Sequence, residues 1–378
     1  MKKKILIIAS FANSLPHFRG DFIQALIKEG YVVFAAAPEI STEVYKKLAS
    51  LGAQPISFKL QRAGMNPFKD FDSILELKKI IKNYEIDLVF PYTIKPVVYG
   101  SIAANLAKVP VISLITGLGF TFSGASAKAN ILQIITKALY RFALRTNECV
   151  ILQNKDDLNL FLDKKILKKN QKTAIVDGSG VNLDKYPFTE KIVKNSNVKF
   201  VIVARLIKEK GIELFMDAAL ALKPKFPLAE FHVIGGKDDT PSAIKIEKLE
   251  ELHNSKTIFF HGLRNDVEDF LQKMHVFVLP SFYREGVPRS GIEGCSSGCA
   301  IITTDMPGCK EIVIHEKNGF LIHPNNLESL IEACSYFLEN PNHIRDMGIQ
   351  SRKLAESKFD VNIINRKLVN HINSALNF

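Results

Sequence analysis

Two pairs of charged residues in the second half of the chain have types and spacings that suit chemistry on a phosphorylated ligand. Glu285 and Glu293 stand eight positions apart and closely follow the apolar run His275–Pro280. Arg205 and Lys210 stand five apart, where another apolar run ends and a helix is expected to begin. Cations and helix N-terminal amides stabilise a leaving diphosphate, and carboxylates accept hydrogen bonds from hydroxyl groups. Taken alone, each pair equally fits charges on a solvated surface.

Taken together, these segments resemble the nucleotide-sugar site of the retaining, family 4 glycosyltransferases with the GT-B fold. The resemblance rests on Glu285-Gly-Val-Pro-Arg-Ser-Gly-Ile-Glu293 and on Arg205 and Lys210, which match the family's Arg…Lys-Gly pair. It implies that Glu285 meets the sugar and that Glu293 accepts hydrogen bonds from the ribose hydroxyls. It also implies that Arg205 and Lys210, with no metal ion or other cofactor, stabilise the diphosphate as the glycosidic bond breaks.

The resemblance adds further positions around the donor. Glycines at a strand end let a backbone approach a ligand closely, a turn after another strand lies beside the nucleobase, and backbone amides next to Glu285 face the sugar. These donor-binding positions are Gly235 and Gly236, Leu263 and Arg264, and Gly286 and Val287. A packed leucine and a solvated arginine explain Leu263 and Arg264 equally well.

Two features near the glutamate motif affect how it is placed. Gly291 and Gly294 each weaken a helix by up to about 1 kcal/mol relative to alanine, which leaves the register of the helix after Glu285 open. The segment Thr303–Glu311 resembles the family's next loop, which closes the cleft near the donor.

The first half of the chain carries candidate acceptor residues. His17 and Arg19 lie in the predicted loop after the first strand, Gly117 and Gly119 follow a later strand, and residues 61–67 form another loop. Open α/β sheets bind ligands at this carboxyl edge. These patches resemble bacterial enzymes that add N-acetylgalactosamine to a lipid diphosphate-linked sugar. We expect His17 and Arg19 to touch acceptor or donor phosphate, with a catalytic and a structural role for His17 equally open.

Strand-like apolar runs alternate with helical patterns, restart once, and predict two parallel sheets covered on both faces. The predicted strands of the first set are residues 4–9, 32–36, 88–90 and 111–115. Those of the second set are residues 198–204, 230–235, 257–260, 276–279 and 300–303. The pattern predicts an α/β fold with two Rossmann-like domains, and the resemblance implies the GT-B type, in which the two domains face across a cleft.

Length and pattern place the domain boundaries. A chain of 378 residues exceeds what one hydrophobic core usually supports. We predict an acceptor-binding domain over 1–188 and a nucleotide-sugar domain over 189–359, with the polar stretch 190–197 as linker. The resemblance implies that a final helix, about 360–378, packs back on the first domain.

Composition excludes several classes of protein. No apolar stretch approaches the roughly 18 to 20 residues that cross a membrane. The first residues read as a buried strand rather than a signal peptide. Five scattered cysteines suggest neither a disulfide framework nor a metal site, and a reduced cytosol suits them.

The net charge of +11 lies in the first half, since residues 1–189 hold 26 Lys and Arg against 15 Asp and Glu. Either this is a solvated surface, or it attracts an anionic membrane face or a diphosphate-bearing acceptor. Nucleic acid is not expected, because the charge forms no stripe. Residues 122–145 mix basic and apolar side chains, which suits a helix in the lipid headgroup region and a helix of the core equally.

We therefore expect a retaining enzyme that moves an N-acetylhexosamine from a UDP donor to an undecaprenyl-diphosphate-linked saccharide. The sugar expected first is N-acetylgalactosamine. It would act at the cytoplasmic membrane face without a protein nucleophile, the departing phosphate taking the acceptor proton. The alternatives are the same fold with UDP-glucose or another donor in capsule or O-antigen synthesis, and a catalytically silent nucleotide-binding module. A dinucleotide-dependent oxidoreductase is disfavoured because no Gly-x-Gly-x-x-Gly follows the first strand.

Overall fold

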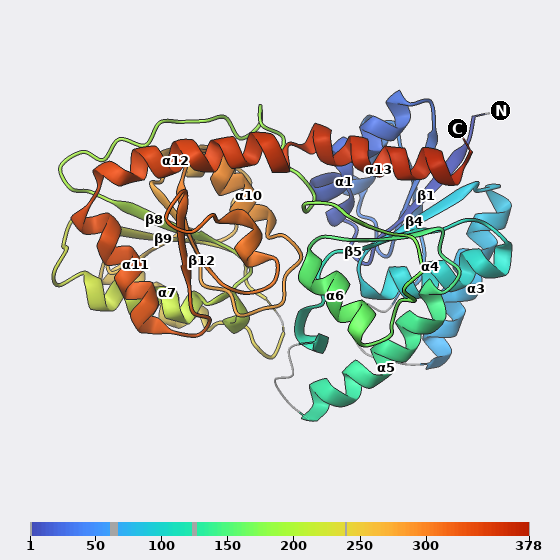
Figure 1. The fold of residues 1–378 in the computed structure, drawn as a ribbon, viewed down its shortest axis with the longest axis horizontal. Coiled ribbons are helices and arrows are strands. Elements are labelled where there is room, and N and C mark those ends of the chain that lie inside the picture. The colour runs from blue at the N-terminus through green and yellow to red at the C-terminus, as the bar shows by residue number, and fades with distance from the viewer. Residues whose placement is uncertain (1, 61–66, 123–126, 239, 378) are drawn as a thin grey trace. The chain divides into compact units, whose positions relative to one another are not determined.

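The computed structural model describes residues 2–60, 67–122, 127–238 and 240–377. It divides into two compact units, residues 1–179 with 361–378 and residues 180–360 (Figure 1). The return of the last helix to the first unit is confirmed. The boundary after Ser179 is earlier than the predicted 188, because Val181 and Tyr186 are buried in the core of the second unit.

The first unit is built on parallel strands. A four-stranded sheet in the order β3-β2-β1-β4 and a three-stranded sheet β5-β6-β7 are joined by the parallel bridges Val89–Val111 and Tyr92–Leu114. The strands are β1 (Lys4–Ile8), β2 (Val32–Ala37), β3 (Gln54–Ser57), β4 (Leu88–Pro91), β5 (Ile112–Ile115), β6 (Cys149–Leu152) and β7 (Thr173–Ile175).

Helices cover both faces of this sheet, because successive strand side chains alternate between two apolar clusters. Ile5 and Ile7 pack with α1, α2 and α13, whereas Leu6 and Ile8 pack with α3 to α6. The helices are α1 (Ser14–Lys28), α2 (Thr42–Ser50), α3 (Pro67–Asn83), α4 (Ile94–Ala107), α5 (Ala127–Leu144), α6 (Lys155–Asp163) and α13 (Val361–Ala375).

The second unit repeats the plan with six parallel strands in the order β10-β9-β8-β11-β12-β13. The parallel sheets predicted from the apolar runs are thus confirmed in both units. The strands are β8 (Lys199–Val203), β9 (Glu230–Ile234), β10 (Phe259–Phe260), β11 (Val276–Leu279), β12 (Ala300–Thr304) and β13 (Gly319–Ile322).

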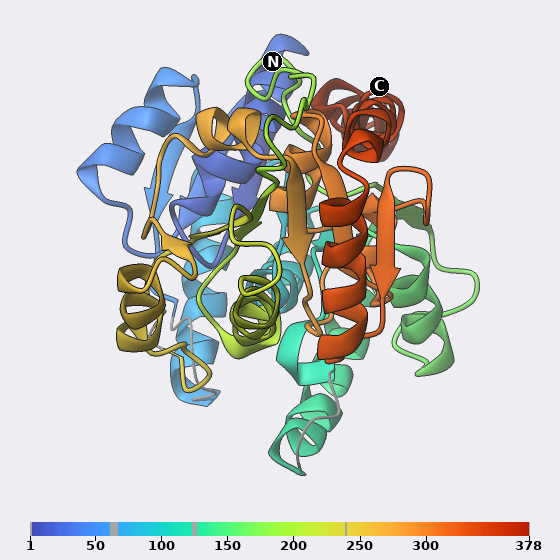
Figure 2. The same ribbon diagram turned by 90° about the vertical axis from the view of Figure 1, so that its left-hand side faces the viewer.

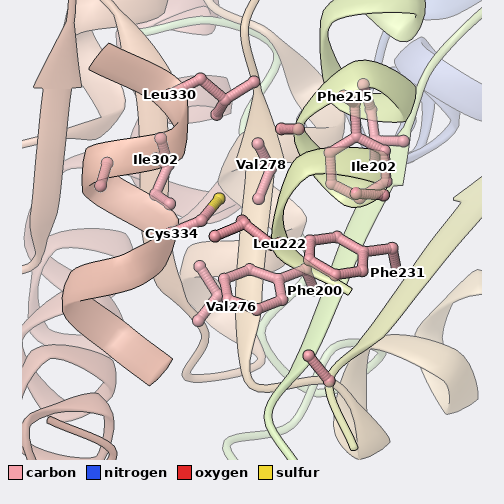
Figure 3. Packing of buried hydrophobic residues seen from close by; sticks show 14 of the residues in the cluster. Phe200, Ile202, Phe215, Leu222, Phe231, Val276, Val278, Ile302, Leu330 and Cys334 are labelled. Carbon is pink, nitrogen blue, oxygen red and sulfur yellow. The ribbon is translucent and has the colours of Figure 1, made fainter. Parts of the chain in front are cut away.

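Helices also flank the sheet of the second unit (Figures 1 and 2). One face buries Phe200, Val278 and Ile302 against α7 and α11, including Leu330 and Cys334 (Figure 3). The helices are α7 (Ile212–Leu222), α8 (Ile246–Asn254), α9 (Val267–Lys273), α10 (Arg289–Ser296), α11 (Leu327–Glu339) and α12 (Asn342–Leu354). All five cysteines are free and buried. Among the described residues, no helix combines the length and apolarity that crossing a membrane requires.

Two local predictions are wrong. His17 and Arg19 lie in helix α1, which begins at Ser14, rather than in a loop. The helix accommodates Pro16 because first-turn amides need no intrahelical acceptor. The predicted linker at 190–197 instead packs on the second unit, where buried Lys191 donates to the carbonyls of Leu271 and Gln272 near the end of α9, each at 2.8 Å.

Candidate active site

The candidate site lies where strand order reverses in the second unit. β8 and β11 are neighbours in the sheet, yet β8 is followed in the chain by β9 on its other side. Ligands of open α/β sheets bind outside the carboxyl ends of the strands at such a reversal. The segments that leave these two strands carry Arg205 and Lys210 after β8 and Glu285 after β11.

Lys210 and Glu285 form an ion pair, and both side chains are largely buried. Ser281, fully buried, lies 3.2 Å from the same carboxylate oxygen and 3.0 Å from the Glu209 carbonyl oxygen. The backbone N–H of Phe282 donates to that carbonyl as well, at 3.0 Å. The two predicted residues are therefore brought together, and Ser281 ties their segments to each other.

Close backbone contact fixes both segments. A Cβ on Gly211, which has φ +75°, would lie 2.2 Å from the Pro280 carbonyl oxygen. A Cβ on Gly308, at φ +82°, would lie 1.5 Å from the carbonyl oxygen of Gly286. Both positions need glycine, because the backbone is left-handed and there is no room for a Cβ atom. The loop 303–311 thus packs on the turn 285–287, where the Val287 side chain is buried.

Arg205 lies at the outer part of the site, and its side chain is about half exposed. Its guanidinium is 3.4 Å from the carboxylate of Asp238, which also accepts the backbone N–H of Thr240 at 2.9 Å. Burial acts to raise the pKa of Asp238, but the Thr240 hydrogen bonds and the Arg205 charge outweigh it and lower that pKa. Asp238 stays ionised and holds the cation over the loop after β9.

Glu293 is nearly buried in α10 and accepts a hydrogen bond from Arg289 Nε at 2.9 Å. Tyr186 also lies beside Glu293, and burial together with the negative charge of Glu293 raises the pKa of this phenol. The two glycines of α10 fix which face of this helix meets its neighbours. A Cβ on Gly294 would lie 2.9 Å from the Phe277 ring, and a Cβ on Gly291 would lie 2.3 Å from Ile312 Cδ1. The missing side chains let α10 pack closely on β11.

The predicted nucleobase positions lie together at the ends of β9 and β10. The Gly235 N–H donates to the Gly262 carbonyl at 2.9 Å, and the Leu263 side chain would contact a Cβ on Gly236. Leu263 is 79% exposed, so it is not the packed leucine of the alternative interpretation. Arg264 instead is held by Asp266 through two hydrogen bonds of 2.8 and 2.6 Å.

A chain of hydrogen bonds runs beneath this turn. His232 Nδ1 lies 2.9 Å from His261 Nε2, and His232 Nε2 lies 3.0 Å from Glu230. Burial lowers the pKa of His232 to about 4, so the ring is neutral near pH 7. A neutral ring that donates to Glu230 accepts from His261, and this arrangement fixes the tautomer of both histidines.

The acceptor candidates lie at the matching strand reversal of the first unit, between β1 and β4. His17 is exposed, whereas Arg19 is 2% exposed with its guanidinium 5.1 Å from the centre of the Tyr92 ring. A phosphate contact would require Arg19 to leave that position. Gly117 and Gly119 follow β5 with positive φ. The loop at 61–66 lies outside the described residues.

Several residues of these sites escape prediction. Ser281, Asp238 and Tyr186 are single polar residues whose role depends on contacts across the fold, and no spacing marks them. Thr93 is another, since this β-branched residue has φ +69° and lies 2.9 Å from the Ser10 hydroxyl. Such strain collects at ligand sites. The one usable signal is position, because Ser281 and Thr93 each follow a buried strand.

The segments beyond the strand ends of the second unit carry Lys210 paired with Glu285, the half-exposed Arg205 beside Asp238, and Glu293 held by Arg289. The cations suit an anionic leaving group and the carboxylates suit hydroxyl groups. Within the described part of the chain, no three His, Cys, Asp or Glu side chains gather as metal ligands would.

Comparison with known proteins agrees with this reading. Residues 184–354 match the family described as "Glycosyl transferases group 1", and residues 4–154 match "Glycosyl transferase 4-like". The chain is 32% identical to the N,N'-diacetylbacillosaminyl-diphospho-undecaprenol alpha-1,3-N-acetylgalactosaminyltransferase of Campylobacter jejuni, over 89% of this chain and 90% of that one. It is 30% identical to an Escherichia coli UDP-Gal:alpha-D-GlcNAc-diphosphoundecaprenol alpha-1,3-galactosyltransferase, over 70% of each.

Solved structures match across both units. A glycosyltransferase from Rickettsia africae superposes with a TM-score of 0.79 at 18% identity, covering 99% of each chain. HepE of Anabaena, in complex with UDP and glucose, gives a TM-score of 0.77 at 18% identity, covering 98% of this chain and 100% of that one. The chain therefore belongs to the group 1 glycosyltransferases and has the GT-B fold.

Proposed function

We propose that this protein transfers N-acetylgalactosamine from UDP to a saccharide carried on undecaprenyl diphosphate, with retention of the anomeric configuration and without a metal ion. The observation that carries the proposal is the 32% identity, over nearly the whole chain, to the Campylobacter N-acetylgalactosaminyltransferase. The galactosyltransferase of Escherichia coli, whose acceptor is also a diphosphoundecaprenol sugar, supports the acceptor class more than the donor sugar.

The second-unit site supports a donor role. Lys210 and Arg205 would stabilise the charge that builds on the UDP diphosphate as the bond to the sugar breaks. Glu285, already paired with Lys210, would orient the sugar, and Glu293, held by Arg289, would accept hydrogen bonds from the ribose hydroxyls. The acceptor hydroxyl would attack on the face that the diphosphate leaves, and a phosphate oxygen would take its proton.

A membrane location is the other part of the proposal, and helix α5 supports it. Its inner face buries Tyr140 and Leu144 in the core, while Ile134 and Phe142 are 65% and 50% exposed. The guanidinium of Arg145 lies 4.5 Å from the centre of the Phe142 ring. An apolar outer face with basic neighbours suits an anionic lipid surface at the cytoplasmic side.

The test is a donor panel with the purified full chain. UDP-N-acetylgalactosamine, UDP-N-acetylglucosamine, UDP-galactose and UDP-glucose are each supplied with an undecaprenyl-diphosphate-linked saccharide in EDTA, and UDP release and lipid product are measured. We expect acceptor-dependent product with the N-acetylgalactosamine donor. Preference for UDP-glucose would favour the alternative donor, and a requirement for added magnesium or manganese would refute the metal-free chemistry. Failure to turn over any donor would favour a silent module.

A further inference from the structure

Ser281 lies just beyond the end of strand β11, in the segment that leads to Glu285, and is fully buried. Its side-chain oxygen accepts the backbone N–H of Tyr283 at 3.2 Å. Two acceptors lie within reach of its one proton, the Glu209 carbonyl oxygen at 3.0 Å and a Glu285 carboxylate oxygen at 3.2 Å. A hydroxyl rotates to suit its partners but has a single proton to donate. Ser281 can therefore donate either to the segment that carries Lys210 or to Glu285.

Each of these two acceptors also has a second donor. The Glu209 carbonyl accepts the backbone N–H of Phe282 at 3.0 Å. The Glu285 oxygen within reach of Ser281 is the same one that pairs with the Lys210 ammonium. Both acceptors thus keep a donor when the hydroxyl turns from one to the other, so both positions of its proton suit these buried surroundings.

The backbone around Ser281 is held by two buried threonines at the end of β12. The Thr303 hydroxyl donates to the Leu279 carbonyl at 2.8 Å, and the Thr304 hydroxyl donates to the Ser281 carbonyl. Neither threonine is exposed. The residue is therefore fixed while its hydroxyl can still rotate, which suits a side chain that positions a neighbouring group.

Breakage of a donor's glycosidic bond would disturb the contact between Lys210 and Glu285, whose side chains are 13% and 12% exposed. The ammonium has three N–H donors, and negative charge growing on a leaving diphosphate would draw them away from the carboxylate. A buried carboxylate that loses its charged partner is costly unless another donor replaces it. The Ser281 hydroxyl lies where it can supply that donor.

We propose that Ser281 is a positioning residue for sugar transfer. Its proton turns to Glu285 as the leaving diphosphate draws the Lys210 ammonium, which keeps the carboxylate against the sugar while the cation serves the phosphate. This role rests on the donor functions proposed above for Lys210 and Glu285. Without the hydroxyl, the carboxylate would hold the ammonium back from the leaving group, so the loss appears at the transition state rather than in donor binding.

The experiment compares Ser281→Ala with the wild-type full chain, using UDP-N-acetylgalactosamine and an undecaprenyl-diphosphate-linked saccharide. We expect kcat to fall about tenfold or more and the calorimetric Kd of the donor to change less than about threefold, because the hydroxyl responds to charge that grows during bond breakage. Ser281→Cys keeps the site filled but is a much weaker donor. It should show the same difference between kcat and Kd, and it decides the matter if Ser281→Ala does not fold.

A double-mutant cycle with Glu285→Ala separates positioning from support of the fold. In that background the carboxylate is gone, so removing the Ser281 hydroxyl should lower kcat by less than about threefold further. Ser351→Ala is the matched control, since Ser351 is also fully buried, lies on α12, and has its hydroxyl 3.2 Å from Asn318 Nδ2. It should lose stability in urea yet keep the wild-type kcat.

Four outcomes would contradict the positioning role and leave the proposed transfer intact. They are an undiminished kcat in Ser281→Ala, a parallel weakening of its donor Kd, an equal loss from it in the wild-type and Glu285→Ala backgrounds, and an equal fall of kcat in Ser351→Ala. The last would mean that loss of any buried hydroxyl has the same effect. A wild type that turns over no donor would overturn the proposed function as well.

Discussion

At the level of single residues, one buried hydroxyl connects two segments of the candidate site in the second unit. Ser281 has one proton and lies within hydrogen-bond distance of both the Glu209 carbonyl and the Glu285 carboxylate. It also accepts the backbone N–H of Tyr283 at 3.2 Å. The position of Lys210 therefore depends on a three-part contact rather than on the ion pair alone.

The cations provide the first prediction. Lys210→Ala and Arg205→Ala should each lower turnover about a hundredfold or more while changing donor affinity much less, because charge builds on the diphosphate mainly at the transition state. Steady-state kinetics and calorimetric titration with the donor measure the two effects. Lys208→Ala is the control, since Lys208 is exposed in the same segment. Near-normal turnover in both variants would remove the assignment.

The sequence predicts residues of this site where a motif sets their spacing. Lys210 and Glu285 lie 75 positions apart and meet in an ion pair. Ser281 and Asp238 could not be predicted, because their roles arise from contacts between loops that no local pattern encodes. Arg19 was chosen as a phosphate contact in a loop. Its burial over the Tyr92 ring could not be predicted, because it depends on where α1 begins.

At the level of secondary-structure elements, the loop after β12 packs closely against the turn at residues 285–287. This contact leads to the second prediction. Gly308→Ala should lower both stability and activity, because its Cβ would lie 1.5 Å from the Gly286 carbonyl oxygen and the left-handed backbone disfavours alanine. Urea denaturation and turnover measure the two effects. Gly30→Ala is the control, with φ +92° but nothing within 4 Å. Equal losses in both variants would mean that backbone strain alone, and not the contact, matters.

Two buried histidines of the second unit provide a prediction on pH. Burial lowers the pKa of His232 and of His275 to about 4, below the value of 6.5 expected in the unfolded chain. Between those values the unfolded state binds protons that the folded state does not. The contribution of each neutral histidine to the free energy of unfolding is therefore fully present above about pH 6.5. It is lost as pH falls toward 4, by up to about 3 kcal/mol for each histidine.

Urea denaturation at pH 7.5 and pH 5 measures this loss. The variant His232→Asn/His275→Asn should lose less stability between the two pH values than the wild type. His323→Asn, at an exposed position, should match the wild type. An unchanged pH dependence in the double variant would show that other groups carry the acid sensitivity.

Strands could be predicted where burial on both faces of the sheet makes their residues a continuous apolar run. β1, β8 and β11 are such strands, and their bounds match within a residue or two. β3 (Gln54–Ser57), β6 (Cys149–Leu152) and β7 (Thr173–Ile175) were missed. β3 and β7 are short, only partly buried and carry no apolar run, whereas β6 is a fully buried apolar run that the strand assignment passed over. The start of α1 at Ser14 was missed, since His17 and Arg19 were predicted in a loop.

At the scale of the whole molecule, both units use the same strand order at their centre. β2-β1-β4 in the first unit corresponds to β9-β8-β11 in the second, so each unit has a strand reversal with polar residues beyond it. The two units differ in net charge, because the whole net charge of +11 lies in residues 1–189.

This charge provides the prediction for the membrane. Binding to anionic vesicles should be measurable by sedimentation and should weaken steeply with salt, since each basic residue near the surface contributes about 1 kcal/mol. Lys137→Glu/Arg145→Glu, in α5 and directly after its end, should weaken binding. Lys317→Glu/Lys353→Glu, which changes net charge equally but in the second unit, should weaken it less. Equal binding to neutral and anionic vesicles would identify the basic half as a solvated surface.

The stereochemistry of transfer and its dependence on Lys210 provide the decisive test of the proposed function. The full chain is incubated in EDTA with UDP-N-acetylgalactosamine, whose sugar is α-linked, and an undecaprenyl-diphosphate-linked saccharide, and the new linkage is read by NMR. We expect an α-linked N-acetylgalactosamine product from the wild type and at least about a hundredfold slower formation by Lys210→Ala. A β-linked product, or an undiminished rate in the variant, would contradict the proposed function.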